Sequence, residues 1–244
     1  MVSSAAVTAA DTIYHVDRLS EDGVLAWFGR HWPRAEPVEI VMEGLEGGAV
    51  TFPRGVPVAR TAWKCILDPI DGTRAFITGR HEWGSLIALE KDEVPVLGMI
   101  DQPVLGERFL GVHGRTVLIE GEKRTPLRVR ECADLKDSTL CATDPSQYFS
   151  PEQQAGFARV KTAARLTRYC GDCYLFAVLA MGFVDVVIEA NFSRWDIAAL
   201  IPIVEGAGGI ITAWDGGDCR DGKTILACGD RRAHEQAMAL LAPR

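Results

Sequence analysis

Two carboxylates stand three residues apart in the sequence CILDPIDGTRAF, residues 65–76, directly after a short apolar run. The apolar run has the character of a buried strand, which would deliver Asp68 and Asp71 with Pro69 between them. Burying two acids together is costly, and no lysine or arginine lies between them to offset the charge. A hard divalent cation such as Mg²⁺, bound by both carboxylates and by the carbonyl of Ile70, would offset it. The alternative is an Asx turn with a second, solvated acid.

Gly72 and Thr73 follow these acids directly. If a helix begins here, its first backbone N–H groups have no partner within the helix and face the space beside the acids. Glycine allows an anion to approach closely, and the N-terminus of a helix favours negative charge. A cation on one side and a helix start on the other predict a site that handles a phosphoryl group.

Acids from other parts of the chain could complete the metal site. In SRWDIAAL, Asp196 stands in the first turn of a predicted buried helix, where capping by Ser193 and the helix dipole could equally explain it. Glu43 stands at the end of a predicted strand, where a glutamate can also be merely solvated. We expect Asp196 to be a third ligand and Glu43 a fourth.

These acids need elements that bring them together, and the residue patterns predict an α/β fold. Residues 83–121 contain short β-rich runs separated by turn residues, which is typical of an antiparallel sheet. Residues 44–60, rich in glycine and proline, predict a loop or hairpin. Pro202 is expected to kink the fourth helix. The predicted helices are 17–28, 150–166, 171–182, 193–209 and 230–242, and the other predicted strands lie at 38–44, 62–67, 183–190, 209–217 and 224–230.

The composition narrows the partners and the compartment. A length of 244 residues suits one large domain or two joined halves. The net charge of −7 argues against a nucleic-acid partner. No apolar run approaches the roughly 20 residues needed to span a bilayer, and the first residues lack the pattern of a secretory signal. Seven scattered cysteines predict small buried thiols in a reducing cytosol, and hence a cytoplasmic protein without membrane association.

The segment LDPIDGTRAF followed by WDIAALIPIVEGAGG resembles the two signature motifs of the inositol monophosphatase-like, Mg²⁺-dependent, lithium-sensitive phosphatases. Within that family, DPIDGTRAFITGRHEWGSLIAL, VLGMIDQPVLGERFLG and ARLTRYCGDCY are most similar to the histidinol-phosphate phosphatase branch. The resemblance implies a layered α-β-α-β-α sandwich. It also implies an N-terminal α+β half, 1–130, with the metal and phosphate motif, and a C-terminal α/β half, 131–244, with Asp196.

The resemblance also implies catalytic roles. Gly72 and Thr73 would donate backbone N–H groups to the phosphate, and the Thr73 hydroxyl would orient the attacking water. Asp17, in IYHVD, loosely matches an aspartate that pairs with this threonine in the family. Glu43 would activate the water, with Glu46 as the second choice, because VMEGLEGG stands where the family has G-E-E. The implied ligands of two or three Mg²⁺ ions are Glu43, Asp68, the Ile70 carbonyl, Asp71 and Asp196.

The expected activity is hydrolysis of a small phosphate monoester by a water molecule that the metal activates. By resemblance, Asp172, Cys173 and Glu189 would bind the part of the substrate beyond the phosphate. Histidinol phosphate carries an ammonium and an imidazole, which suit two acids. Inositol 1-phosphate, with hydroxyl groups, is the alternative. A catalytically inactive relative that binds metal or phosphate is a further alternative, suggested by the altered glutamate motif and the short N-terminal stretch. The resemblance implies a homodimer.

Overall fold

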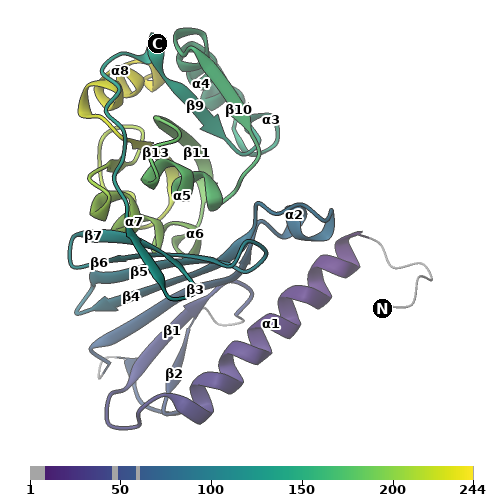
Figure 1. Ribbon diagram of the computed structural model, residues 1–244. Helices are drawn as coiled ribbons and strands as arrows, with labels where there is room; N and C mark the ends of the chain where they lie inside the picture. The colour runs from purple at the N-terminus through teal and green to yellow at the C-terminus, as the bar shows by residue number, and fades with distance from the viewer. Residues whose placement is uncertain (1–8, 46–48, 59–60, 244) are drawn as a thin grey trace.

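Two β-sheets, with helices between them and on their outer faces, make up the computed structural model (Figure 1). The structure describes residues 9–45, 49–58 and 61–243. Within these residues, the first sheet has eight strands in the order β2-β1-β3-β4-β5-β6-β7-β8, and the second has five in the order β10-β9-β11-β13-β12. The strands of the first sheet are β1 Val38–Met42, β2 Val50–Phe52, β3 Trp63–Asp71, β4 Gly84–Lys91, β5 Val94–Gln102, β6 Glu107–Val112, β7 Arg115–Glu120 and β8 Lys123–Pro126. Those of the second are β9 Thr139–Ala142, β10 Leu166–Tyr169, β11 Val186–Phe192, β12 Ile210–Thr212 and β13 Lys223–Cys228.

The helices form three layers around these sheets. In Figure 1, α1 crosses the outer face of the first sheet, α5, α6 and α7 lie between the sheets, and α4 and α8 cover the outer face of the second. The predicted α-β-α-β-α sandwich is therefore confirmed. The helices are α1 Ala9–His31, α2 Thr73–Ile77, α3 Pro145–Tyr148, α4 Pro151–Ala163, α5 Tyr174–Ala180, α6 Arg194–Ile197, α7 Leu200–Gly206 and α8 Arg231–Leu241, with a 3₁₀ turn at Leu135–Asp137.

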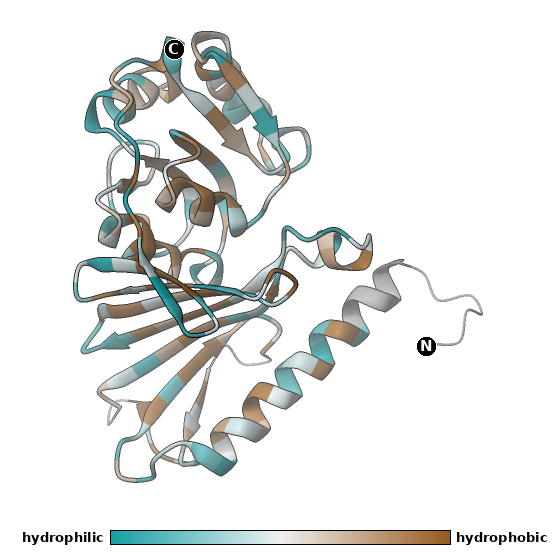
Figure 2. Ribbon diagram, viewed as in Figure 1, coloured by the Kyte–Doolittle hydropathy of each residue, from teal (hydrophilic) through white to brown (hydrophobic). Residues whose placement is uncertain are grey.

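Apolar side chains pack on both faces of the first sheet, because successive residues of a strand face opposite sides. In β3, Ile66 joins the core between the sheets, whereas Cys65 and Leu67 join a separate core beneath α1. Phe28 of α1 packs into that second core. The exposed side of α1 is mixed, because Leu19 and Trp27 are exposed beside its polar residues. Hydrophobic and hydrophilic residues alternate along the helix in Figure 2. Both faces of β3 are thus packed, which holds the strand that carries Asp68 in place.

The predicted helix 193–209 is two helices in the structure, with the break one turn before the expected kink. Pro202 lies in the first turn of α7. Proline has no N–H to donate to the carbonyl of Ala198, so the hydrogen-bond ladder stops there, while the first turn of a new helix accepts proline readily. The short α6 that results carries Asp196.

The sequence patterns also missed two strands of the second sheet. β9 is only four residues long and fully buried, and β10 is a largely exposed edge strand without apolar alternation. The N-terminus of α4 agrees with the prediction, because Ser150 and Gln153 form a capping box there.

Five of the seven cysteines are buried, as expected, whereas Cys132 is half-buried and Cys170 is exposed. All seven are free thiols. Among the described helices, none has the length and apolar content needed to cross a membrane.

Replacing Gly98 by alanine is expected to destabilise the fold. A Cβ at Gly98 would overlap the backbone carbonyl of Ala199, at the point where α6 leads into α7 against β5. Overpacking of this kind costs about 1–3 kcal/mol, which lowers the melting temperature of a chain of this size by several degrees. Gly23→Ala is the matched control, because Gly23 lies exposed in α1 with open space around its Cα. Gly23→Ala should melt slightly above the parent, because alanine favours a helix interior over glycine by about 0.5–1 kcal/mol. A Gly98→Ala variant that melts no lower than the parent would contradict the close packing at Gly98.

Candidate active site

The end of β3 is distorted so that Asp68 and Asp71 turn toward one space. Its register with β4 shifts between these two residues, where Pro69 has no N–H for the ladder. The N–H of Ile70 donates instead to the Asp68 carboxylate at 3.0 Å. The Ser85 hydroxyl donates to the Pro69 carbonyl at 2.6 Å, which fixes the bulge to β4. Pro69 thus contributes to the bulge that directs both acids toward one space.

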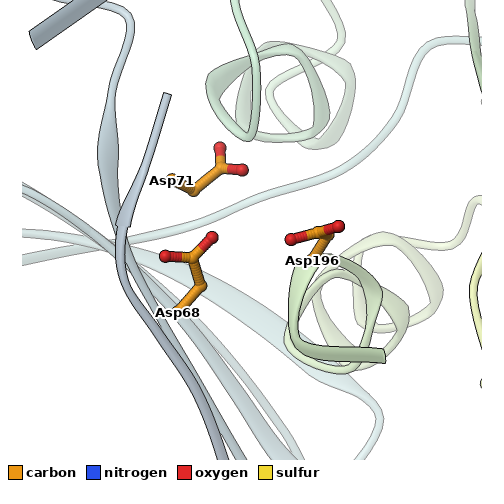
Figure 3. Close-up of side chains that lie close together, drawn as sticks. All are labelled: Asp68, Asp71 and Asp196. Carbon is orange, nitrogen blue, oxygen red and sulfur yellow. The ribbon is translucent and has the colours of Figure 1, made fainter. Parts of the chain in front are cut away.

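Asp196 meets these two acids from the other sheet's side of the molecule. One carboxylate oxygen from each of Asp68, Asp71 and Asp196 lies within 4.8 Å of the other two, and Figure 3 shows the three side chains directed into one space. The backbone N–H of Ser193 donates to Asp196 at 2.7 Å, and that of Cys173 donates to Asp71 at 2.7 Å. With the N–H of Ile70 on Asp68, all three carboxylates are therefore oriented by backbone donors.

Mutual repulsion and burial disfavour the ionised form of all three acids. Burial, and then the charge of Asp71, raises the pKa of Asp68 well above its ordinary range. Burial, and then the charge of Asp172, does the same to the pKa of Asp71. Burial raises the pKa of Asp196 to about 7. A cluster of carboxylate oxygens at this spacing, without a cationic side chain among them, has the donor chemistry that Mg²⁺ requires.

A helix does begin beside these acids, as predicted. α2 starts at Thr73, and its N-cap, Gly72, has a φ of 82°, which glycine adopts without strain. A side chain at Gly72 would also crowd the Glu82 carbonyl, 3.0 Å from an added Cβ. The Thr73 hydroxyl donates to the Ile70 carbonyl at 3.0 Å. The expected pairing of Thr73 with Asp17 stays a prediction.

A cavity of about 360 Å³ contains nearly all the residues singled out from the sequence. Cys173 is not among its described lining residues: its thiol is buried, and its backbone holds Asp71. Glu43 follows β1 and lines the cavity, and burial raises its pKa. Glu46 lies outside the described residues. The predicted residues that line the cavity are Asp17, Glu43, Asp68, Ile70, Asp71, Gly72, Thr73, Asp172, Glu189 and Asp196.

Besides the three acids that converge, and besides Asp17 and Glu43, the cavity is lined by Asp172 and Glu189. Glu189 is buried in β11, and it accepts hydrogen bonds from the Thr143 backbone N–H at 2.6 Å and hydroxyl at 2.8 Å. Burial raises its pKa to about 8. Asp172 has a left-handed backbone with a φ of 42°, and burial raises its pKa to about 6. At neutral pH, Asp172 is thus the more strongly ionised of the two.

Several residues that line the cavity were not predicted from the sequence, among them Arg74, Thr143 and Tyr148. The Arg74 guanidinium lies 5.3 Å from the centre of the Tyr148 ring. Arg74 is the one cationic residue among the described lining residues. Arg74 directly follows the D-G-T motif, and this position could have indicated a role near the site. Thr143 and Tyr148 belong to a segment without a recognisable motif.

Known proteins resemble this chain over most of its length. It is 40% identical over 197 residues to the bifunctional phosphatase IMPL2, chloroplastic, of Arabidopsis thaliana, which covers 73% of this chain and 56% of that protein. It is 33% identical over 202 residues to a histidinol-phosphatase of Mycobacterium tuberculosis, covering 82% of this chain and 73% of that one. The chain thus spans little more than half of the Arabidopsis protein.

A solved structure and a protein family also match this chain. The structure of an inositol monophosphatase from Zymomonas mobilis superimposes with a TM-score of 0.80 and 32% identity, over 99% of this chain and 87% of that one. The sequence matches the inositol monophosphatase family over residues 7–243. Since that match covers nearly every residue, the chain belongs to the inositol monophosphatase family.

Proposed function

We propose that this protein is a Mg²⁺-dependent phosphomonoesterase whose substrate is histidinol phosphate. The observation that carries the proposal is the meeting of Asp68, Asp71 and Asp196 within 4.8 Å of one another, beside the helix start at Thr73. A metal site and an anion site side by side suit a phosphate ester. The phosphatase names of the relatives support the same reaction class.

The donor set favours two or three Mg²⁺ ions held by Asp68, Asp71, Asp196, Glu43 and the carbonyl of Ile70. Bound Mg²⁺ supplies charge neutralisation for the phosphate and lowers the pKa of water in the site. The acids that bind metal are not available as nucleophiles, so direct attack by water, without a phospho-enzyme, is the expected course.

The chain's own groups position the reactants. The backbone N–H groups at Gly72 and Thr73 donate to the phosphate oxygens. Glu43, at the end of β1, accepts a proton from the attacking water, and its burial-raised pKa makes it a stronger base than an exposed glutamate. The Thr73 hydroxyl, already directed at the Ile70 carbonyl, aligns that water. Asp17, on α1 in the same cavity, pairs with Thr73 when substrate is bound.

The choice of histidinol phosphate rests on the acids beyond the metal set. Asp172 offers a carboxylate that is largely ionised at neutral pH, and it lines the same cavity as the phosphate site. An ammonium group on the substrate gives a charge-assisted hydrogen bond there. Glu189, held by Thr143, offers a second oxygen for the imidazole. The Mycobacterium tuberculosis relative carries the name histidinol-phosphatase, which agrees with this choice.

Inositol 1-phosphate is the second candidate, because the same acids can accept hydrogen bonds from hydroxyl groups. The structural similarity to the Zymomonas mobilis inositol monophosphatase supports it. An inactive relative is disfavoured, because Glu43 lines the cavity although the G-E-E motif is altered. The homodimer, the cytoplasmic location and the division into halves 1–130 and 131–244 stay predictions.

Asp71→Asn is expected to lower Mg²⁺-dependent phosphate release at least about 100-fold, because the variant removes a metal-binding charge. Asparagine can still accept the N–H of Cys173, so the fold is retained. Phosphate release from histidinol phosphate, with and without Mg²⁺, measures the effect. Asp22→Asn, at an exposed position of α1, is the control and keeps full activity. Normal turnover by Asp71→Asn would refute the metal assignment.

Asp172→Asn is expected to raise the KM for histidinol phosphate about tenfold, since hydrogen bonds to charged groups contribute about 1.5–3 kcal/mol. Asparagine tolerates the left-handed backbone at this position. The KM for inositol 1-phosphate should change much less, because its hydroxyl groups can bond to the amide. Equal changes for both esters, in a panel that also includes fructose 1,6-bisphosphate, would remove the argument for a cationic substrate.

Glu189→Gln is expected to stabilise the metal-free protein at alkaline pH. The folded-state pKa of about 8 lies above the ordinary value of 4.5, so the folded state holds the proton more tightly. Stability from this group is therefore full below about pH 4.5 and is lost as pH rises toward 8, by an amount on the order of 3–5 kcal/mol. Glutamine keeps both Thr143 hydrogen bonds without titrating. Denaturant unfolding in EDTA should show equal stability near pH 4 and a more stable variant at pH 8.5; parallel pH curves would contradict the buried-acid assignment.

A further inference from the structure

A row of charged residues crosses three neighbouring strands of the first sheet. Lys64 of β3 is the register partner of Glu39 in β1 and of Glu90 in β4. The Lys64 ammonium lies 3.6 Å from the Glu39 carboxylate and 2.8 Å from that of Glu93, in the turn between β4 and β5. Three adjacent segments of the sheet are thus joined through one lysine.

Arg194 of α6 joins this network through Glu90 and Glu93. It is the first residue of α6, and its guanidinium donates to the Glu90 carboxylate at 2.8 Å. The same guanidinium lies 3.6 Å from the carboxylate of Glu93. Since Lys64 also pairs with Glu93, α6 is linked by ion pairs to β4, to the β4–β5 turn and, through Lys64, to β3 and β1.

Three of the linked segments each carry one of the site acids, two or four residues after the charged residue. Lys64 precedes Asp68 by four residues on β3, and Arg194 precedes Asp196 by two in α6. Glu39 precedes Glu43 by four at the end of β1. Side chains four residues apart on a strand share one face, about 13 Å from each other. The charged row therefore runs parallel to the row of site acids on the same face of the sheet.

Holding α6 on the sheet through the Glu90–Arg194 ion pair costs free energy, because charged groups must be removed from water. The Glu90 side chain is 2% exposed, and the buried Nε of Arg194 has no hydrogen-bond partner among the described residues. Apolar residues of similar size at such buried sites often give equal or greater stability. What an ion pair offers instead is a defined geometry, because the guanidinium must keep its direction toward the carboxylate.

We propose that Arg194 and Glu90 are positioning residues that set the distance of Asp196 from Asp68 and Asp71, and with it the affinity for divalent cations. The inference rests on the proposed function, because it assigns these acids to a metal. Without the pair, α6 still packs on the sheet through its apolar side, but the direction of its first turn is no longer fixed by Glu90. Residues that orient metal ligands typically account for about 10–100-fold in metal affinity.

Three variants separate positioning from stability. Arg194→Met leaves Glu90 buried without its partner. The double variant Glu90→Leu/Arg194→Met replaces the pair with apolar side chains. Arg130→Met is the matched control, because Arg130 pairs with Asp185, which is 1% exposed and directly precedes β11, and neither residue is among the described residues that line the cavity. Mn²⁺ binding followed by electron paramagnetic resonance, Mg²⁺ binding by calorimetry and the melting temperature are measured for each.

Arg194→Met and the double variant are both expected to bind Mn²⁺ about tenfold more weakly, although the double variant regains the melting temperature. Arg194→Lys should recover part of the affinity, and Arg130→Met should lower the melting temperature with unchanged Mn²⁺ binding. If affinity instead follows the melting temperature, so that the double variant regains both, the pair is merely structural and the inference is wrong. A parent protein that binds no Mn²⁺ would overturn the proposed function itself.

Discussion

The repulsion among Asp68, Asp71 and Asp196 is the constraint on which the rest of this structure depends. Asp68 is buried and Asp71 and Asp196 are half-buried, and neighbouring charges add to the cost of ionising Asp68 and Asp71. Acids of this kind stay together only if the packing elsewhere holds their segments in place or a cation compensates them. The apolar cores on both sides of the first sheet supply the first condition. The carboxylate oxygens, which could hold a metal ion, supply the means for the second.

Close approach of the helices to the first sheet makes this meeting possible. Gly98 and Gly111 have no side chains where the backbone of the α6–α7 segment crosses β5 and β6. Larger residues there would lift α6 away from the sheet and move Asp196 from the acids on β3. Apolar packing alone allows a helix to slide or rotate slightly, because it has little directional preference. The ion pairs of Arg194 add direction at the point where the ligand-bearing turn begins.

The residues that the sequence predicted are those whose role follows from a local pattern. The D-P-I-D-G-T motif contains its own strand end, bulge and helix start, so Asp68, Asp71 and the start at Thr73 could be inferred without coordinates. Asp196, from a distant segment, was expected beside them because its motif accompanies theirs in the family, but the backbone contacts between distant segments could not be inferred. The backbone N–H of Cys173 holds Asp71 across 102 positions of sequence, and no side-chain pattern marks such a donor. The predicted role of the Cys173 side chain in binding substrate has no counterpart among the cavity-lining residues.

The choice of substrate depends on the charges elsewhere around the cavity more than on the acids that we propose to bind metal. If Mg²⁺ and a phosphate dianion bound as proposed, they would largely compensate one another and the acids on β3 and α6. Asp172 and Glu189 lie outside that balance. Arg74 is the one cationic residue among the described lining residues, and Arg80 also lowers the pKa of Asp172. The Arg74 guanidinium lowers the pKa of Asp172 less than burial raises it, so this acid is only partly compensated. A substrate that brings its own cation next to the ester removes the remaining imbalance, whereas a polyol leaves it in place. On the proposed function, the same acids would also disfavour a second anionic group on the substrate, which would favour monoesters over bisphosphates.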